Sequence, residues 1–296
     1  MYFWEDSDFK KRLDTARMVI KNRARGLRFG ENRSRYFGHG IEVSHLKNYS
    51  EGEDVRFIDW NASFRLGRTF LKVFSETREN IIYILLDRSA SMEFGAPETK
   101  SQTAVKVAYS LAHVALSGFN RVMLSEFSEG VVSTVSLGRS DINRKFAAVV
   151  DSAKAPGKTA IERSLRDFFA NFRRRGVVFM ISDLVDQPLS ITDQISRLSL
   201  AHNFCLVHVN CAEDKGLPES GEFKFEDSET GETVEISMTP DIARRFASAN
   251  TDFASGVSRR CLKYGGFYIP VACGSDPADV VRKIMLRSEL GFSDNR

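Results

Sequence analysis

Short apolar runs separated by segments of helical periodicity constrain the fold of this chain most. Residues 81–86 and 177–181 are continuous apolar runs, as expected for strands covered on both faces of a parallel sheet. After the first run, apolar residues recur at helical spacing, for example at Ala104, Val107 and Leu111. This alternation predicts an α/β fold: a doubly wound, mostly parallel sheet with helices on both faces, Rossmann-like in architecture.

The α/β pattern occupies residues 80–290, which we expect to form the main domain. An inserted polar hairpin is expected near 221–237, and a capping box predicts a helix that begins after Thr99. Residues 1–79 lack this pattern, and we expect an N-terminal extension with a basic helix, packed on the main domain. The other predicted elements are strands at 122–124, 131–135, 204–209 and 267–271, and helices at 141–152, 160–173, 188–199, 240–262 and 277–288.

The composition indicates a globular protein. Hydrophobic residues make up 42% of the chain and charged residues 27%, which is sufficient for a hydrophobic core. No apolar run approaches the ~18 residues that a membrane-spanning helix needs. The N-terminus is acidic at Glu5 and Asp6 and differs from a signal peptide. We therefore expect a cytoplasmic protein with no membrane span.

The cysteines give no sign of a disulfide framework or a zinc site. The four of them form no CxxC pair, and we expect buried thiols at Cys205 and Cys211. Cys205, His208 and Cys211 are spaced closely enough to suggest a metal site. Cys205 and His208 lie on the predicted strand 204–209, however, where alternation places them on opposite faces, which argues against zinc.

Charge is concentrated near the N-terminus. Residues 10–35 hold ten basic side chains and two acidic ones, although the whole chain carries a net charge of only +3. Such a segment can bind nucleic acid, anionic lipid or an acidic protein. It can also be the solvated face of a helix that docks on its own acidic body, and Leu13 and Ala16 have the spacing of an amphipathic helix. Phe29 is the single aromatic residue among these charges, which offers little stacking surface and argues against nucleic acid.

Oxygen-bearing side chains follow the two buried strands. Asp87, Ser89 and Ser91 follow the first strand on alternate positions, and Asp183 follows the second. Thr159 lies between them, just before a predicted helix. Because ligands bind at the carboxyl ends of strands in such sheets, we expect these five side chains to converge. Hard oxygen ligands suit Mg²⁺ or Mn²⁺, and Mg²⁺ keeps waters that an incoming ligand can replace.

Three other interpretations apply to these residues. Asp87 can simply cap a turn or helix. It can also be the nucleophile of an Mg²⁺-dependent phosphotransfer enzyme, although such phosphatases usually carry a second aspartate where this chain has Ser89. Gly157-Lys158-Thr159 is similar to the end of a phosphate-binding loop, but the required earlier glycine is replaced by Ser152.

The spacing Asp-x-Ser-x-Ser, followed by a threonine and an aspartate, resembles the metal-ion-dependent adhesion site (MIDAS) of von Willebrand factor A domains. The matching positions are Asp87, Ser89, Ser91, Thr159 and Asp183. In that family the hydroxyls contact the metal directly or through water, the aspartates act largely through waters, and a partner's carboxylate commonly completes the coordination. The resemblance implies a metal-dependent protein-binding module.

A second resemblance lies upstream. Residues 48–60 read NYSEGEDVRFIDW and are similar to the signature Y-x-x-G-D-x-x-R-x-I-D-W of a bacterial family called domain of unknown function 58, with Glu53 where aspartate is usual. The similarity extends over roughly residues 36–290. Members are typically encoded beside MoxR-type AAA+ ATPases and are thought to act with them in chaperone-like complex maturation. We interpret Arg56, Asp59 and Trp60 as an internal salt bridge and a buried aromatic that fasten residues 36–80 to the main domain; the alternative is a surface that docks an ATPase.

Together these features predict a non-enzymatic, Mg²⁺-dependent protein-binding adaptor. Its partner would supply an acidic residue, and the resemblance points to a MoxR-type ATPase or the client of that ATPase. The alternatives left open are phosphotransfer through Asp87 and nucleic-acid binding through the basic N-terminal segment.

Overall fold

The computed structural model describes residues 2–26, 42–75, 81–118, 120–128, 130–152, 161–184, 191–212, 214, 220–226 and 233–291. These residues form two compact units, one from within 1–26 and 80–295 and the other from within 27–79. Residues up to 26, which the sequence pattern groups with the extension, therefore belong to the α/β unit.

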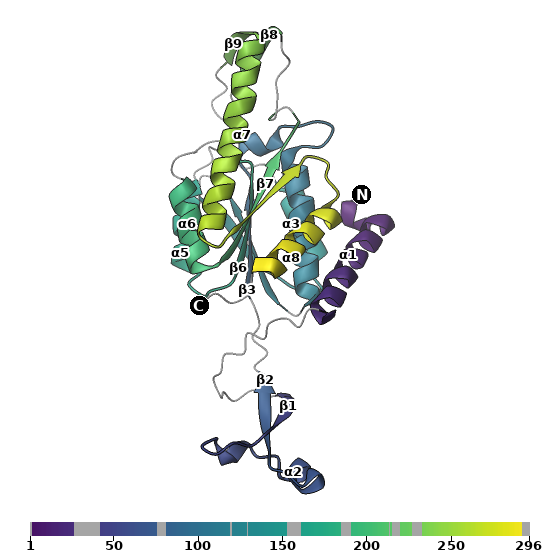
Figure 1. The fold of residues 1–296 in the computed structure, drawn as a ribbon. Helices are drawn as coiled ribbons and strands as arrows, with labels where there is room; N and C mark the ends of the chain where they lie inside the picture. The colour runs from purple at the N-terminus through teal and green to yellow at the C-terminus, as the bar shows by residue number, and fades with distance from the viewer. Residues whose placement is uncertain are drawn as a thin grey trace. The chain divides into compact units, whose positions relative to one another are not determined.

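A six-stranded sheet forms the centre of the first unit. Its order is β10-β7-β6-β3-β4-β5, and all neighbours are parallel except β4 and β5. This confirms the predicted fold class, a doubly wound and mostly parallel sheet (Figure 1). The strands are β3 (Ile81–Asp87), β4 (Arg121–Phe127), β5 (Val131–Leu137), β6 (Val177–Ser182), β7 (Asn203–Asn210) and β10 (Phe267–Ala272).

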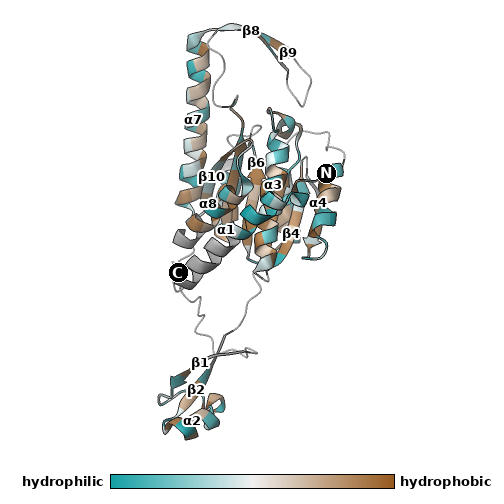
Figure 2. Cartoon of the chain, turned by 90° about the vertical axis from the view of Figure 1, so that its right-hand side faces the viewer, coloured by the Kyte–Doolittle hydropathy of each residue, from teal (hydrophilic) through white to brown (hydrophobic). Residues whose placement is uncertain are grey.

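Helices cover both faces of the sheet because each buried strand is apolar on both sides. In β3, Ile84 packs into one core cluster, whereas Tyr83 and Leu85 pack into the other. Figure 2 shows hydrophobic colouring concentrated on the central strands. The first face holds α1 (Ser7–Gly26), α3 (Lys100–Ser117), α4 (Ile142–Asp151) and α8 (Pro277–Gly291); the second holds α5 (Ile161–Asn171), α6 (Ile191–Ala201) and α7 (Pro240–Lys263).

The N-terminal segment is part of this core. Trp4, in the 3₁₀ turn η1 (Phe3–Glu5), is 3% exposed and stacks on Tyr109 of α3 with ring centroids 5.3 Å apart. Leu13 and Ala16 are buried, as the amphipathic spacing predicts. The neighbouring basic side chains are exposed, and Arg12 forms an ion pair with Asp276 at 3.6 Å.

The predicted insertion is a hairpin of β8 (Gly221–Glu226) and β9 (Thr233–Met238), paired antiparallel. It precedes α7, which Thr239 caps by accepting a hydrogen bond from the backbone N–H of Ile242. Among the described residues, no helix is both long enough and apolar enough to cross a bilayer.

The second unit contains β1 (Glu42–Asn48), η2 (Val55–Phe57), α2 (Trp60–Leu66) and β2 (Phe70–Ser75), with β1 and β2 antiparallel. The interpretation of its signature residues was wrong in one respect, the partner of Arg56. Arg56 pairs with Asp54, two residues away, while Asp59 caps α2 and pairs with Lys72 at 3.7 Å. Trp60 is 61% exposed. Its burial against the main domain stays a prediction.

Candidate metal site

The predicted site residues lie where β3 and β6 end. These strands are neighbours, and the chain leaves β3 toward β4 on one side before it returns to β6 on the other. This arrangement is the topological switch point at which α/β sheets bind ligands. The turn η3 (Ala90–Glu93) follows β3 and contains Ser91. After β6, the buried Leu184 adopts a left-handed φ of 60° directly beyond Asp183.

Hydrogen bonds connect four of the five predicted residues. Oδ1 of Asp87 accepts from the backbone N–H of Ser89 at 2.9 Å. The hydroxyls of Ser89 and Ser91 lie 3.1 Å apart, and Ser91 donates to Oδ1 of Asp183 at 3.2 Å. Ser182, which no sequence motif singles out, donates to Oδ2 of Asp87 at 2.5 Å. Residues from strand ends more than 90 positions apart thus form one buried polar cluster.

The fifth predicted residue, Thr159, lies outside the described residues, so its place in the site stays a prediction. Arg88, which adjoins the motif, has partners away from it: Glu126 at 3.6 Å and Ser152 at 3.3 Å. Among the described residues, no three His, Cys, Asp or Glu side chains gather as a metal site. A cation here would therefore depend on hydroxyl oxygens in addition to the two carboxylates.

Electrostatics favour a cation beside Asp87. The side chain is 0% exposed, and burial together with the nearby Asp183 carboxylate raises its pKa to about 7. A divalent cation would offset both effects, because it would neutralise charge that the buried site otherwise disfavours. Two carboxylates and two hydroxyls are hard ligands of the kind that Mg²⁺ and Mn²⁺ prefer. The residues present therefore fit the predicted ion.

In metal-free protein we expect a pH dependence that traces to Asp87. Its pKa is about 7 in the folded chain, against roughly 3.9 in an unfolded one, so its contribution to stability is fully present below the lower value and lost as pH rises through the higher. The free energy of unfolding of the wild type minus that of Asp87→Asn should fall as pH rises from about 4 to about 7. Urea titrations in chelator measure it.

The free energy of the Asp87→Asn variant is subtracted because two buried histidines also make stability depend on pH. Burial lowers the pKa of both His202 and His208, so their contributions to stability are lost as pH falls, opposite in sign to that of Asp87. Both histidines are present in wild type and variant and cancel. A difference that stays flat over this range would contradict the raised pKa of Asp87.

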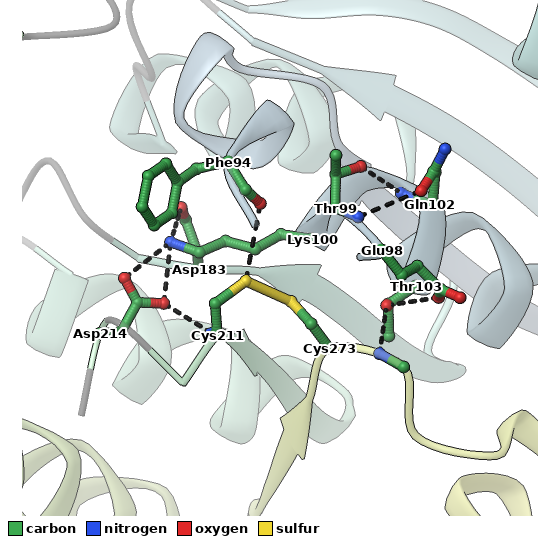
Figure 3. The surroundings of a disulfide bond; sticks show 11 residues. Phe94, Glu98, Thr99, Lys100, Gln102, Thr103, Asp183, Cys211, Asp214 and Cys273 are labelled. Carbon is green, nitrogen blue, oxygen red and sulfur yellow. Dashed lines mark hydrogen bonds and ion pairs between the residues drawn. A yellow bond between two sulfur atoms is a disulfide. The ribbon is translucent and has the colours of Figure 1, made fainter. Parts of the chain in front are cut away.

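A lysine that sequence reasoning missed completes the cluster (Figure 3). Nζ of Lys100 lies 3.1 Å from Oδ2 of Asp183 and 3.0 Å from Asp214, and its side chain is 3% exposed. Burial lowers the pKa of Lys100, but the two carboxylates outweigh burial and hold that pKa above its usual value. Lys100 is the first residue of α3, where the helix dipole disfavours a cation. A lysine at the N-terminus of a predicted helix was therefore the sequence feature that could have indicated a nearby carboxylate partner.

His208 is a structural residue here. Its Nδ1 lies 2.6 Å from the Tyr268 hydroxyl and its Nε2 lies 3.0 Å from the backbone oxygen of Asp183. Cys205 packs into the core cluster of the opposite sheet face, as alternation predicts. Both ring nitrogens of His208 therefore have partners. The Tyr268 hydroxyl orients the ring, and the ring in turn fixes the backbone of Asp183.

The expectation of buried thiols at Cys205 and Cys211 is confirmed for Cys205 and was wrong for Cys211, which forms a disulfide. Cys211 and Cys273 form a disulfide with their Cα atoms 5.1 Å apart, whereas Cys205 and Cys261 are free and buried. The pair is 62 residues apart and meets only because β7 and β10 are neighbours in the sheet. The pairing of these two cysteines depends on the order of the strands in the sheet, which spacing along the chain does not reveal.

Comparison with known proteins identifies the family. The family described as "Protein of unknown function DUF58" matches residues 45–255, well over half of the chain. The chain belongs to the DUF58 family. This DUF58 protein is 25% identical over 293 residues to the uncharacterized protein Mb1516 of Mycobacterium bovis, covering 96% of the chain and 91% of that relative.

Solved structures that the DUF58 protein resembles are more distant. One is the conserved hypothetical protein BatB of Bacteroides thetaiotaomicron, at 13% identity and a TM-score of 0.40, covering 71% of this chain and 98% of that one. Another is a von Willebrand factor type A protein of Catenulispora acidiphila, at 16% identity and a TM-score of 0.39, covering 72% and 43% of the two chains.

Proposed function

We propose that this DUF58 protein is a non-enzymatic, Mg²⁺-dependent protein-binding adaptor that acts in the cytoplasm. The observation that carries the proposal is the buried cluster of Asp87, Ser89, Ser91 and Asp183 at the switch point of the sheet. Its oxygen donors suit Mg²⁺ or Mn²⁺, and the raised pKa of Asp87 reflects burial beside a second carboxylate, which a bound cation would offset.

In this proposal Asp87, Ser89, Ser91 and Asp183 hold the ion, together with Thr159. An acidic side chain of the partner would supply a further oxygen in place of a water. The exposed fraction is 0% for Asp87 and Ser89 and 7% for Ser91. A partner's carboxylate cannot reach the ion while the cluster is covered to this extent, so we expect capture of the partner to involve a local opening.

The partner that we propose is a MoxR-type AAA+ ATPase or a client of that ATPase. Support for it comes from the family resemblance of the signature in residues 48–60. In this arrangement the DUF58 protein would contribute recognition, and the ATPase would contribute the energy for assembling or maturing a complex.

The two alternative functions have less support. Asp87 as a phosphotransfer nucleophile would need an accessible oxygen, but it is fully buried and both of its oxygens accept hydrogen bonds. The start of the basic segment lies on a helix whose Leu13 is buried and whose Arg12 pairs with Asp276, as expected for a helix docked on its own domain.

Affinity capture tests the adaptor proposal. Tagged full-length protein is incubated with cell extract in Mg²⁺ or in chelator, and the retained proteins are identified by mass spectrometry. We expect an ATPase or its client to be retained in Mg²⁺ and lost in chelator. The matched variants are Asp87→Asn, which should lose the partner, and Asp252→Asn on an exposed stretch of α7, which should keep it. Equal recovery with and without chelator would refute metal dependence.

A further inference from the structure

The disulfide lies at the same edge of the sheet as the candidate metal site. Cys211 directly follows β7 and Cys273 directly follows β10, and these parallel strands pair in register up to Asn210 and Ala272. The backbone N–H of Cys273 also donates to the carbonyl of Asn210 at 2.9 Å. A Cα separation of 5.1 Å falls in the range that a disulfide needs, and the sheet itself sets it. The two sulfurs therefore stay neighbours whether or not they are bonded.

A short series of polar contacts joins Cys211 to Asp183 (Figure 3). The backbone N–H of Cys211 donates to Oδ2 of Asp214 at 2.7 Å, and Lys100 donates to Oδ1 of Asp214 and to Oδ2 of Asp183, each at 3.1 Å. Because Asp214 is held by the backbone of Cys211, the position of that backbone decides how Lys100 is shared between its two carboxylates.

The other half of the disulfide reaches the same helix. The backbone N–H of Gly274, beside Cys273, donates to the hydroxyl of Thr103 in α3 at 3.1 Å. Thr103 in turn donates to Glu98, just before the helix begins, at 2.6 Å. Both sulfur-bearing residues are thus linked to the start of α3, where Lys100 lies.

The surroundings suit a reduced pair as well as an oxidised one. Sγ of Cys211 lies 3.6 Å from the carbonyl oxygen of Phe94, which would accept a hydrogen bond from a thiol at that position. Cys211 is buried, whereas Cys273, which directly follows the edge strand β10, is partly exposed. Cys205 and Cys261 are buried and free, and burial raises the pKa of Cys261 to about 12, so it stays protonated and unreactive.

We propose that Cys211 and Cys273 are a reversible thiol–disulfide pair that adjusts the cation site through Asp214 and Lys100. A thiolate of a dithiol reductant attacks Sγ of Cys273, forms a mixed disulfide and releases Cys211 as a thiolate. The second thiol of the reductant then displaces Cys273 and closes the reductant's own disulfide. Two electrons and two protons pass from the reductant to the cysteines. Reduction removes the covalent restraint on Cys211, while strand pairing keeps it beside Cys273. The Cys211 backbone then fluctuates more, and Asp214 competes less well with Asp183 for Lys100.

The pair itself is tested by equilibrating the full chain in buffers with graded ratios of oxidised and reduced dithiothreitol. Free thiols are then alkylated and located by mass spectrometry. We expect Cys211 and Cys273 to be alkylated together under reducing conditions, and protected again on return to oxidising ones. Cys205→Ser should behave like wild type, and Cys273→Ser should leave Cys211 free at every ratio. Alkylation of both cysteines at all ratios, or failure of the bond to re-form, would overturn the proposal.

Coupling is tested by amide hydrogen exchange on the oxidised and reduced chain. Exchange in residues 94–103 and 211–214 should be about tenfold faster in the reduced form, because local opening there loses a restraint, while β4 stays unchanged. This readout needs no metal. Equal exchange in the two forms would refute the coupling.

The effect on the cation site rests on the proposed function and is measured by Mg²⁺ titration. Binding should be about fivefold weaker in the reduced chain, and Asp214→Asn should weaken the oxidised chain similarly. Equal Mg²⁺ affinity in both redox forms overturns the proposed adjustment. If neither redox form binds Mg²⁺, the proposed function is overturned, and the proposed adjustment of the site with it. The alkylation result then tests the reversible disulfide by itself, and the exchange result tests its coupling to residues 94–103 and 211–214.

Discussion

Asp87→Asn should weaken Mg²⁺ binding by more than about a hundredfold, since even residues outside the coordination sphere of a metal commonly contribute 10–100-fold. Asparagine keeps the size of the side chain and can still accept the hydrogen bond from the backbone N–H of Ser89. It removes the charge that a cation would bind. Isothermal titration calorimetry of the metal-free protein with MgCl₂ measures the change.

The same substitution should leave the fold intact and, in chelator, should not destabilise it. The reason is that burial and Asp183 already disfavour the charge on Asp87. A loss of Mg²⁺ binding with unchanged or higher thermal stability would therefore assign Asp87 to the ion. Asp252→Asn, at an exposed position, serves as the control. If Asp87→Asn bound Mg²⁺ as tightly as this control, the site would be assigned to the wrong residues.

Lys100→Met should have the second large effect. Methionine fills a similar volume but leaves Asp183, whose side chain is 1% exposed, without the ammonium group 3.1 Å away. Removing one partner of a buried ion pair typically costs about 3–5 kcal/mol, because the other charge remains buried. Urea unfolding in chelator should show a loss of that size, and saturating Mg²⁺ should recover part of it by supplying another cation.

Lys106→Met is the matched control on the same helix. Lys106 also pairs with a carboxylate, Glu98, but its side chain is 29% exposed, so the loss should stay below about 1 kcal/mol. Lys100→Met should in addition bind Mg²⁺ more tightly than wild type, because the ammonium group of Lys100 no longer competes with Mg²⁺ for Asp183. Equal stability of the two variants would show that Lys100 is not the counter-charge of the buried carboxylates.

The order of elements was predictable because it depends on local pattern. The runs at 81–86 and 177–181 are apolar on both faces, and helical spacing separates them, so each strand and helix is indicated by its own residues. The rule that ligands bind beyond strand ends then placed Asp87 and Asp183 at one edge. The hydrogen bonds among Asp87, Ser89, Ser91 and Asp183 follow from that placement.

What the sequence did not indicate depends on contacts between distant segments. Lys100 meets Asp183 across 83 positions, and Ser182 meets Asp87 across 95. The disulfide requires knowing that β10 lies next to β7, which no spacing along the chain specifies. In the second unit the error was local: Arg56 could pair with either of two nearby aspartates, and pattern alone did not distinguish Asp54 from Asp59.

The stacking of Trp4 on Tyr109 has a practical consequence for anyone who designs fragments of this protein. A truncation that starts at residue 80, where the α/β pattern begins, would discard Trp4, Phe9 and Leu13 and leave the aromatic face of Tyr109 open to solvent. The folding unit is discontinuous in the chain, and the DUF58 signature lies in the insertion between its two parts. Expression of the α/β unit by itself therefore calls for joining residues 1–26 to residue 80 through a linker.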